Sequence, residues 1–136
     1  MRRFLLFTIF LFVGLLSFGQ DLAYPSLYQF HNLPEHENAT IKQLSRVTDN
    51  LRDGIKIFLE SPDDYITLRQ YYESVMFNLE WELLESNAVS KMREMGKLDM
   101  IPFSGEFVKE GLKYMIFTTR IGSLTKINIT LVRVQN

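Results

Sequence analysis

The residues best suited to chemistry lie in one short segment near the front of the chain. Residues 31–37 read HNLPEHE and place two imidazoles and two carboxylates close together. Such side chains bind divalent metals or act as acid and base, so His31, His36 and Glu35 are the candidate metal ligands. Pro34 interrupts any helix that would bring the two histidines together, and their spacing matches no helical or finger-type ligand pattern. We therefore interpret the segment as a polar loop with solvated histidines, and we predict no metal or other cofactor.

Paired carboxylates are the second source of acid and base chemistry. Asp63 and Asp64 form one such pair, but they stand where a helix start favours negative charge. Glu80 and Glu82 share the polar face of an expected strand, with Glu85 just after it. No serine has the G-x-S-x-G context, and the scattered glycines form no phosphate-binding fingerprint. The sequence thus predicts no catalytic residues, and we expect a protein that is not an enzyme.

Residues 89–103 are unusually apolar for a connection between elements, and methionine suits adaptable contact surfaces. Tyr71 and Phe77 lie on the helix expected after Ser61 and fall outside the buried stripe of that helix. Arg69 and Lys56 are expected to be solvated residues near these aromatic rings. The alternative is that the segment folds over an open end of the sheet and buries its own side chains. The candidate residues for a partner or ligand surface are Val89, Met92, Met95, Met100, Ile101, Phe103, Tyr71 and Phe77.

Composition excludes several classes of protein. The 136 residues are 46% hydrophobic and 23% charged, which indicates one globular domain rather than a disordered chain. There is no cysteine, so disulfides, iron–sulfur clusters, thiolate zinc sites and a cysteine nucleophile are excluded. The formal net charge of −1 gives no electrostatic case for binding nucleic acid.

The first 19 residues predict export. Arg2 and Arg3 precede an apolar run from Phe4 to Phe18, which is the layout of a signal peptide. As a helix this run would span about 22 Å against about 30 Å for a bilayer core, which is short for a permanent anchor. We predict cleavage after Gly19, so the membrane is met only through the leader, and the mature chain is secreted or periplasmic. An uncleaved anchor is the alternative.

The remaining chain divides into an extended lead-in, residues 20–40, and a single domain, residues 41–136. Strands are expected over 41–47, where a helix is the alternative, and over 55–60, where apolar and polar residues alternate. Ser61-Pro62-Asp63-Asp64 predicts a helix start with Ser61 as the N-cap. The helix stripe holds Tyr65, Leu68, Tyr72, Val75, Met76 and Leu79, and Asn78 is the expected left-handed stop.

A strand is expected from Trp81, followed by a short helix over 87–96 capped by Asn87 and an apolar loop over 98–103. Strands at 105–109, 112–121 and 125–134 follow, separated by the turns Glu110-Gly111 and Gly122-Ser123. The sequence therefore predicts an α+β fold: one main helix packed on an antiparallel sheet of about six strands, in the order β-β-α-β-β-β-β.

This order, with Tyr24-Pro25 near the mature start and Trp81 just after the helix, resembles that of small exported bacterial domains, and the resemblance implies no particular activity. Our hypothesis is a non-enzymatic binding or interaction module of the cell envelope, whose partner is another envelope protein or a small apolar ligand. The alternative is a small periplasmic metal-assisted hydrolase that uses the His31 and His36 loop.

Overall fold

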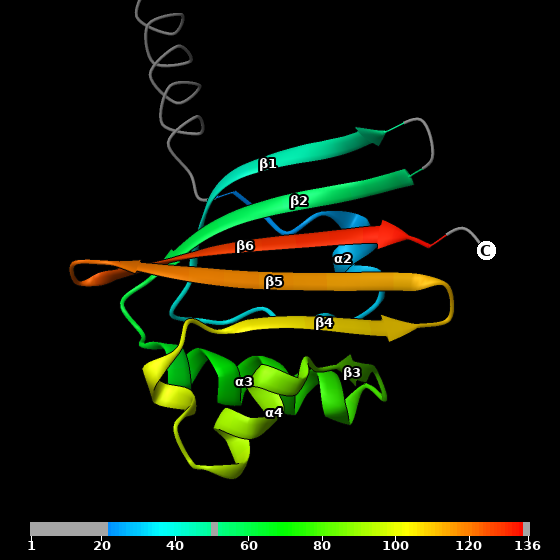
Figure 1. The fold of residues 1–136 in the computed structure, drawn as a ribbon. Coiled ribbons are helices and arrows are strands. Elements are labelled where there is room, and N and C mark those ends of the chain that lie inside the picture. The colour runs from blue at the N-terminus through cyan, green and yellow to red at the C-terminus, as the bar shows by residue number, and fades with distance from the viewer. Residues whose placement is uncertain (1–21, 50–51, 135–136) are drawn as a thin grey trace, which may run out of the picture.

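A six-stranded antiparallel sheet forms the centre of the molecule (Figure 1). The computed structural model describes residues 22–49 and 52–134. Across the sheet the strands run in the order β1-β2-β6-β5-β4-β3, so β1 and β3 are its two edges. The strands are β1 (Thr40–Asp49), β2 (Arg52–Ser61), β3 (Glu82–Leu84), β4 (Ser104–Lys109), β5 (Leu112–Ile121) and β6 (Leu124–Arg133). The predicted α+β class and the order of its strands are confirmed.

Three α-helices accompany the sheet in the described part of the chain: α2 (Ser26–Phe30), α3 (Tyr65–Asn78) and α4 (Asn87–Glu94). A 3-10 turn, η1 (Leu98–Met100), follows α4. Figure 1 shows α2 against the sheet and α3 beside α4 next to β4. The prediction of an extended lead-in was wrong at α2, because the short helix turns Tyr28 into the core, where its side chain is fully buried.

One face of the sheet, here called the inner face, carries the core. Ile57 on β2 pairs with Ile129 on β6, which pairs in turn with Ile116 on β5, and all three side chains are buried. The neighbouring rows hold Leu131 beside Tyr114 and Ile127 beside Thr118. Because side chains alternate across a strand, this regular register places one continuous apolar surface under the helices. Each such buried aliphatic side chain contributes about 1.5–3 kcal/mol to folding.

Two hairpins join the last three strands, as the turn residues predict. Glu110 and Gly111 have φ values of 48° and 80°, which are the two left-handed positions that a two-residue type I′ turn requires. Gly122 has a φ of 63° in the following hairpin. The turns fix the register of β4, β5 and β6, and the register decides which face is buried.

The main helix begins and ends differently from the prediction. Asp64, not Ser61, is the N-cap of α3, and its carboxylate accepts a hydrogen bond of 2.9 Å from the Thr67 amide. Ser61 is the buried last residue of β2, and its hydroxyl instead accepts from the Asp63 amide. At the other end Asn78 is still helical, and Glu80, with a φ of 65°, takes the left-handed conformation.

Residues 1–19 and the predicted cleavage site after Gly19 lie outside the described residues. Within residues 22–49 and 52–134, none of the helices has both the length and the apolar character needed to cross a bilayer.

Candidate functional site at the α3, β3 and α4 edge

The apolar insert between β3 and β4 is held on the surface. Ser86, not Asn87, caps α4, and its hydroxyl lies 3.3 Å from the Val89 amide. Gly96, in a left-handed conformation, follows the C-terminal end of α4. None of the residues of α4 is buried. A helix without a buried face must be positioned by other contacts.

The candidate surface residues of this segment fall into three groups. Met95 and Met100 are 57% and 71% exposed. Val89, Met92 and Ile101 are half-buried, so they contact the rest of the fold without joining the core. Phe103 is fully buried and its ring packs beside that of Tyr72, so it belongs to the core and not to an exposed surface.

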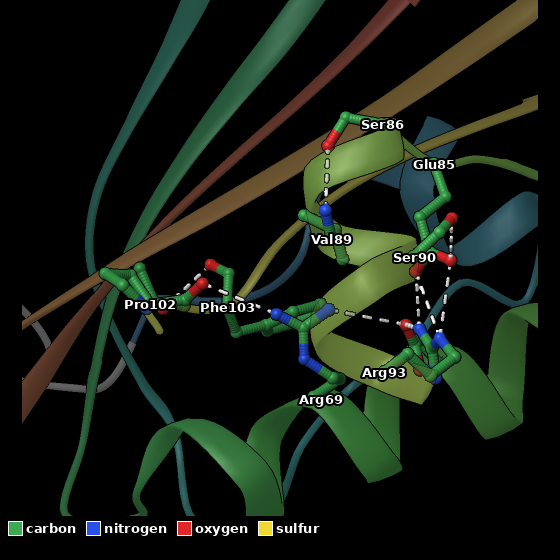
Figure 2. A network of polar contacts seen from close by, with 10 residues as sticks. Arg69, Glu85, Ser86, Val89, Ser90, Arg93, Pro102 and Phe103 are labelled. Atoms are coloured by element: carbon green, nitrogen blue, oxygen red, sulfur yellow. Dashed lines mark hydrogen bonds and ion pairs between the residues drawn. The ribbon is translucent and has the colours of Figure 1, made fainter. Parts of the chain in front are cut away.

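Ion pairs hold α4 against α3 and the end of β3 (Figure 2). The Arg93 guanidinium lies 2.6 Å from the Glu73 carboxylate and 2.7 Å from that of Glu85. The Ser90 hydroxyl donates to Glu85 at 3.0 Å. One arginine therefore joins carboxylates from two different segments, and this helps to position α4, none of whose residues is fully buried.

The electrostatics of this cluster favour its charged form. Hydrogen bonds from Arg93 lower the pKa of the Glu85 carboxyl, and those to Glu85 and Glu73 raise the pKa of the Arg93 guanidinium. Both shifts mean that the ionised state is the bonded state. The pairs are partly exposed, so each contributes at most about 1 kcal/mol, and their main effect is geometric.

Arg69 extends the same cluster into the core, so the prediction of a solvated side chain at this position was wrong. The residue is 1% exposed, and its guanidinium lies 5.0 Å from the centre of the Phe103 ring. Burial lowers its pKa, and Glu73, its nearest carboxylate, is 3.6 Å away. Figure 2 shows Arg69 reaching the carbonyl of Pro102, at 3.4 Å, so the side chain connects α3 to the end of the insert.

A shallow groove opens beside these ion pairs, and we call it the insert groove. It has a volume of about 340 Å³ and is lined by Glu73, Ser74, Phe77, Trp81, Leu83, Arg93 and Phe107. Trp81 and Phe107 are buried below it, whereas the Phe77 ring is 80% exposed. The exposure of Phe77 agrees with its position outside the buried stripe of α3. The groove therefore combines an apolar floor, an exposed ring and a charged rim.

The two histidines occupy different surroundings, and the interpretation of both as solvated was wrong for His36. The His36 Nε2 atom lies 2.6 Å from the Asp63 carboxylate, and the imidazole side chain is only 9% exposed. Its ring packs 4.5 Å from that of Tyr71, which is consequently half-buried. His31 instead contacts Phe30 edge to face. Among the described residues, His, Asp and Glu side chains form no group of three that could hold a metal ion.

A group of buried phenols lies beneath the lead-in, and we call Tyr24, Tyr28, Tyr72 and Tyr114 the tyrosine cluster. The Tyr28 hydroxyl donates to the Pro34 carbonyl and lies 2.9 Å from the Tyr114 hydroxyl. The hydroxyls of Tyr24 and Tyr72 are buried without a hydrogen-bond partner among the described residues. Burial raises the pKa of all four phenols, so they are neutral groups and poor proton acceptors at physiological pH.

The paired carboxylates are placed by structural contacts. Asp63 bonds to His36, Asp64 caps α3 and Glu85 binds Arg93. Glu80 occupies a left-handed turn position before β3, and Glu82 is exposed on that edge strand. Nothing in these positions brings two carboxylates together around a shared opening.

Sequence reasoning identified the insert but not the groove beside it. Trp81, Leu83 and Phe107 fall in expected strands, but their proximity to Phe77 depends on the pairing of β3 with β4. The spacing of Arg69 and Glu73, four apart on one helix, was the available signal for the buried arginine. Comparison with protein-family models, curated proteins and solved structures finds no match to this chain.

Proposed function

We propose that this protein is a non-enzymatic binding module of the cell envelope, which holds a partner protein by accepting an apolar side chain into the insert groove. The observation that carries the proposal is the Phe77 ring, 80% exposed beside a groove floored by Trp81 and Phe107. Exposed aromatic rings next to apolar hollows are the usual anchors of protein interfaces.

The size and rim of the insert groove suit a protein side chain better than a whole ligand. A volume of about 340 Å³ is at the lower end of small-molecule sites, and the groove is shallow. Glu73 and Arg93 at its rim are ion-paired to each other, so a partner meets charges that are already satisfied. Apolar contact at the centre with paired charges at the rim is the arrangement of a binding hot spot.

The way the insert is positioned supports the same proposal. The contacts of Arg93 with Glu73 and Glu85 position α4 before any partner arrives. A surface that is already ordered loses less conformational entropy on binding, so more of the contact energy appears as affinity. Met95 and Met100, exposed at the end of the same segment, add adaptable apolar area.

A photo-crosslinking experiment tests this surface against a matched control. Phe77 and Phe30 are 80% and 78% exposed, so random collisions would label both positions equally. A photoreactive phenylalanine analogue is placed at each position in turn, and the protein is irradiated in intact cells. We expect a discrete adduct of one mass at position 77 and none at position 30.

The partner identified in this way is then purified and its affinity measured. Phe77→Ala should weaken binding by about 30-fold, as expected for a hot-spot aromatic, and Phe30→Ala should leave it unchanged. Equal adducts at both positions, or unchanged affinity of Phe77→Ala, would contradict the proposal. The mass of the native N-terminus tests the export that it assumes, because cleavage after Gly19 leaves Gln20 first.

A further inference from the structure

A second hollow lies away from the insert, at the β1 edge of the sheet, and we call it the α2 groove. It has a volume of about 710 Å³. One wall is formed by the start of α2 and the residue before it, and the floor and far wall are formed by β1, β2 and the end of β6. Its lining residues are Pro25, Ser26, Leu27, Leu44, Ser45, Arg46, Asp53, Gly54, Ile55 and Arg133.

The groove exists because the helices leave this end of the inner face uncovered. Ile55 pairs with Leu131 across the sheet, yet Leu131 is buried and Ile55 is only half-buried. In the same way, Leu44 is half-buried although its neighbour Ile57 is fully buried. Apolar side chains that belong to the core face thus form the floor of an open groove.

Two arginines at the rim give the groove its charge. Arg46 and Arg133 are exposed, and neither makes an ion pair or side-chain hydrogen bond within residues 22–47 and 53–134, whose side chains the structure describes. In contrast, Arg69, Arg93 and Arg120 each bind a carbonyl or a carboxylate. Guanidinium groups beside an apolar floor are suited to an anionic group carried by an apolar body.

Asp53 is the acidic residue of the lining, and it favours a ligand with one compact anionic group. Its carboxylate, also exposed, leaves the lining with one net positive charge. A polyanion would meet the repulsion of Asp53, whereas a single carboxylate can bind one guanidinium and avoid it. The groove volume falls within the range of about 300–1,000 Å³ found for small-molecule sites.

We propose that the α2 groove binds a single-chain amphiphile with one carboxylate, of the fatty-acid class. The alkyl chain lies on Leu44 and Ile55, and the carboxylate binds Arg46 or Arg133 at the rim. This site is separate from the insert groove and does not depend on the function proposed above, since Arg46 lies on β1 and the insert groove on the opposite edge strand, β3.

The first test uses dodecanoate as the probe, below its micelle concentration, with the full mature chain. Amide chemical shifts mapped by NMR should change at Leu27, Leu44 and Ile55 and saturate with one ligand per protein. The neutral dodecanol and the cationic dodecyltrimethylammonium should bind at least about tenfold more weakly, because both lack the charge that pairs with the rim. Saturable binding of all three probes with equal affinity would overturn the charge assignment, and no saturable shift at these amides would overturn the site.

The second test uses variants with matched controls. Arg46→Gln combined with Arg133→Gln should weaken dodecanoate binding by about tenfold or more, because the charge-assisted hydrogen bonds are lost. Lys126→Gln removes one positive charge from an exposed site on β6 outside the groove lining and should leave the affinity within twofold. Unchanged affinity of the double variant would overturn the proposal.

A variant that blocks the groove sterically tests the location of the site without changing its charge. Ser26→Trp adds a ring to an exposed residue of α2 that lines the groove, and it should reduce dodecanoate binding at least about tenfold. Gln29→Trp adds the same ring to the same helix outside the lining and should have no effect. Because both residues are exposed, folding is preserved in each case, and equal binding by the two variants would refute the location.

Discussion

Arg69 offers a sharp test of the energetics of this fold, because its buried charge is poorly compensated. The Arg69 guanidinium lies 3.6 Å from the Glu73 carboxylate and 3.4 Å from the Pro102 carbonyl, both longer than a good charge-assisted bond. Its Nε atom is buried without a partner among the described residues. Desolvation of such a group costs several kcal/mol.

The contacts that oppose this cost are small. Two long polar contacts return at most about 1 kcal/mol each, and the cation–π contact with Phe103 returns about 1–2 kcal/mol. Methionine matches the arginine side chain as far as Nε and carries no charge, and Glu73 keeps Arg93 at 2.6 Å when Arg69 is replaced. We therefore expect Arg69→Met to leave the free energy of unfolding unchanged or to raise it by about 1 kcal/mol. Arg69→Ala should lower it by about 3 kcal/mol, since it leaves a cavity.

Urea unfolding followed by the fluorescence of Trp81, the single and buried tryptophan, measures both effects. Arg120→Met is the contrasting control. The Arg120 Nη1 atom donates to the Pro62 and Asp63 carbonyls at 3.2 and 2.9 Å and to the Thr125 hydroxyl at 2.9 Å, so its loss should lower stability by about 2–3 kcal/mol. This reasoning would be refuted if Arg69→Met lowered the free energy of unfolding by more than about 2 kcal/mol, or if Arg120→Met lowered it by less than about 2 kcal/mol.

Three further predictions concern stability. Gly54→Ala should lower the free energy of unfolding by about 2 kcal/mol or more, measured by urea titration, because its Cβ would lie 2.4 Å from the Leu131 carbonyl oxygen. Burial raises the pKa of the tyrosine cluster above the ordinary 10.0, so the free energy of unfolding falls as the pH rises above 10. The tyrosinate absorbance of these four of the six tyrosines should therefore appear together with unfolding, and their ionisation while the protein stays folded would contradict this prediction. Arg93 lowers the pKa of the Glu85 carboxyl below 4.5, so the stability that this pair adds is present above pH 4.5 and is lost as the pH falls through the pKa of Glu85 in the folded protein. Urea titrations across this pH range should therefore show a weaker pH dependence of the free energy of unfolding in Glu85→Gln.

The strands were predictable because local pattern and tertiary environment agree in them. Apolar and polar residues alternate through β6, and Ile127, Ile129 and Leu131 all lie on the buried face. The hairpins followed from Glu110-Gly111 and Gly122-Ser123, where turn geometry depends on only two residues. Where the period was clear over ten residues, no long-range information was needed.

The helix boundaries and the site depended on contacts that sequence spacing does not contain. Ser61 has the chemistry of an N-cap, but β2 continues through it, and burial beside β6 decides its role. His36 reaches Asp63, 27 residues away, and Arg69 reaches Pro102, 33 residues away. Such pairings arise from the packing of the lead-in and the insert on α3, so a local pattern could predict neither.

The positions of the two grooves have a consequence for how the molecule works. The α2 groove is lined by β1, β2 and the end of β6, and the insert groove by β3 and β4 together with α3, so β5 lies between the two grooves in the sheet (Figure 1). A packed sheet carries energetic coupling between two sites only if it has a second arrangement available. Without one, the free-energy effects of substitutions at distant sites are additive. We therefore expect Phe77→Ala to leave dodecanoate affinity within twofold and Arg46→Gln to leave partner affinity within twofold, both measured by calorimetry. A coupling above fivefold would show that the sheet moves as the grooves fill, and the protein would then link a small ligand to the capture of its partner instead of binding each alone.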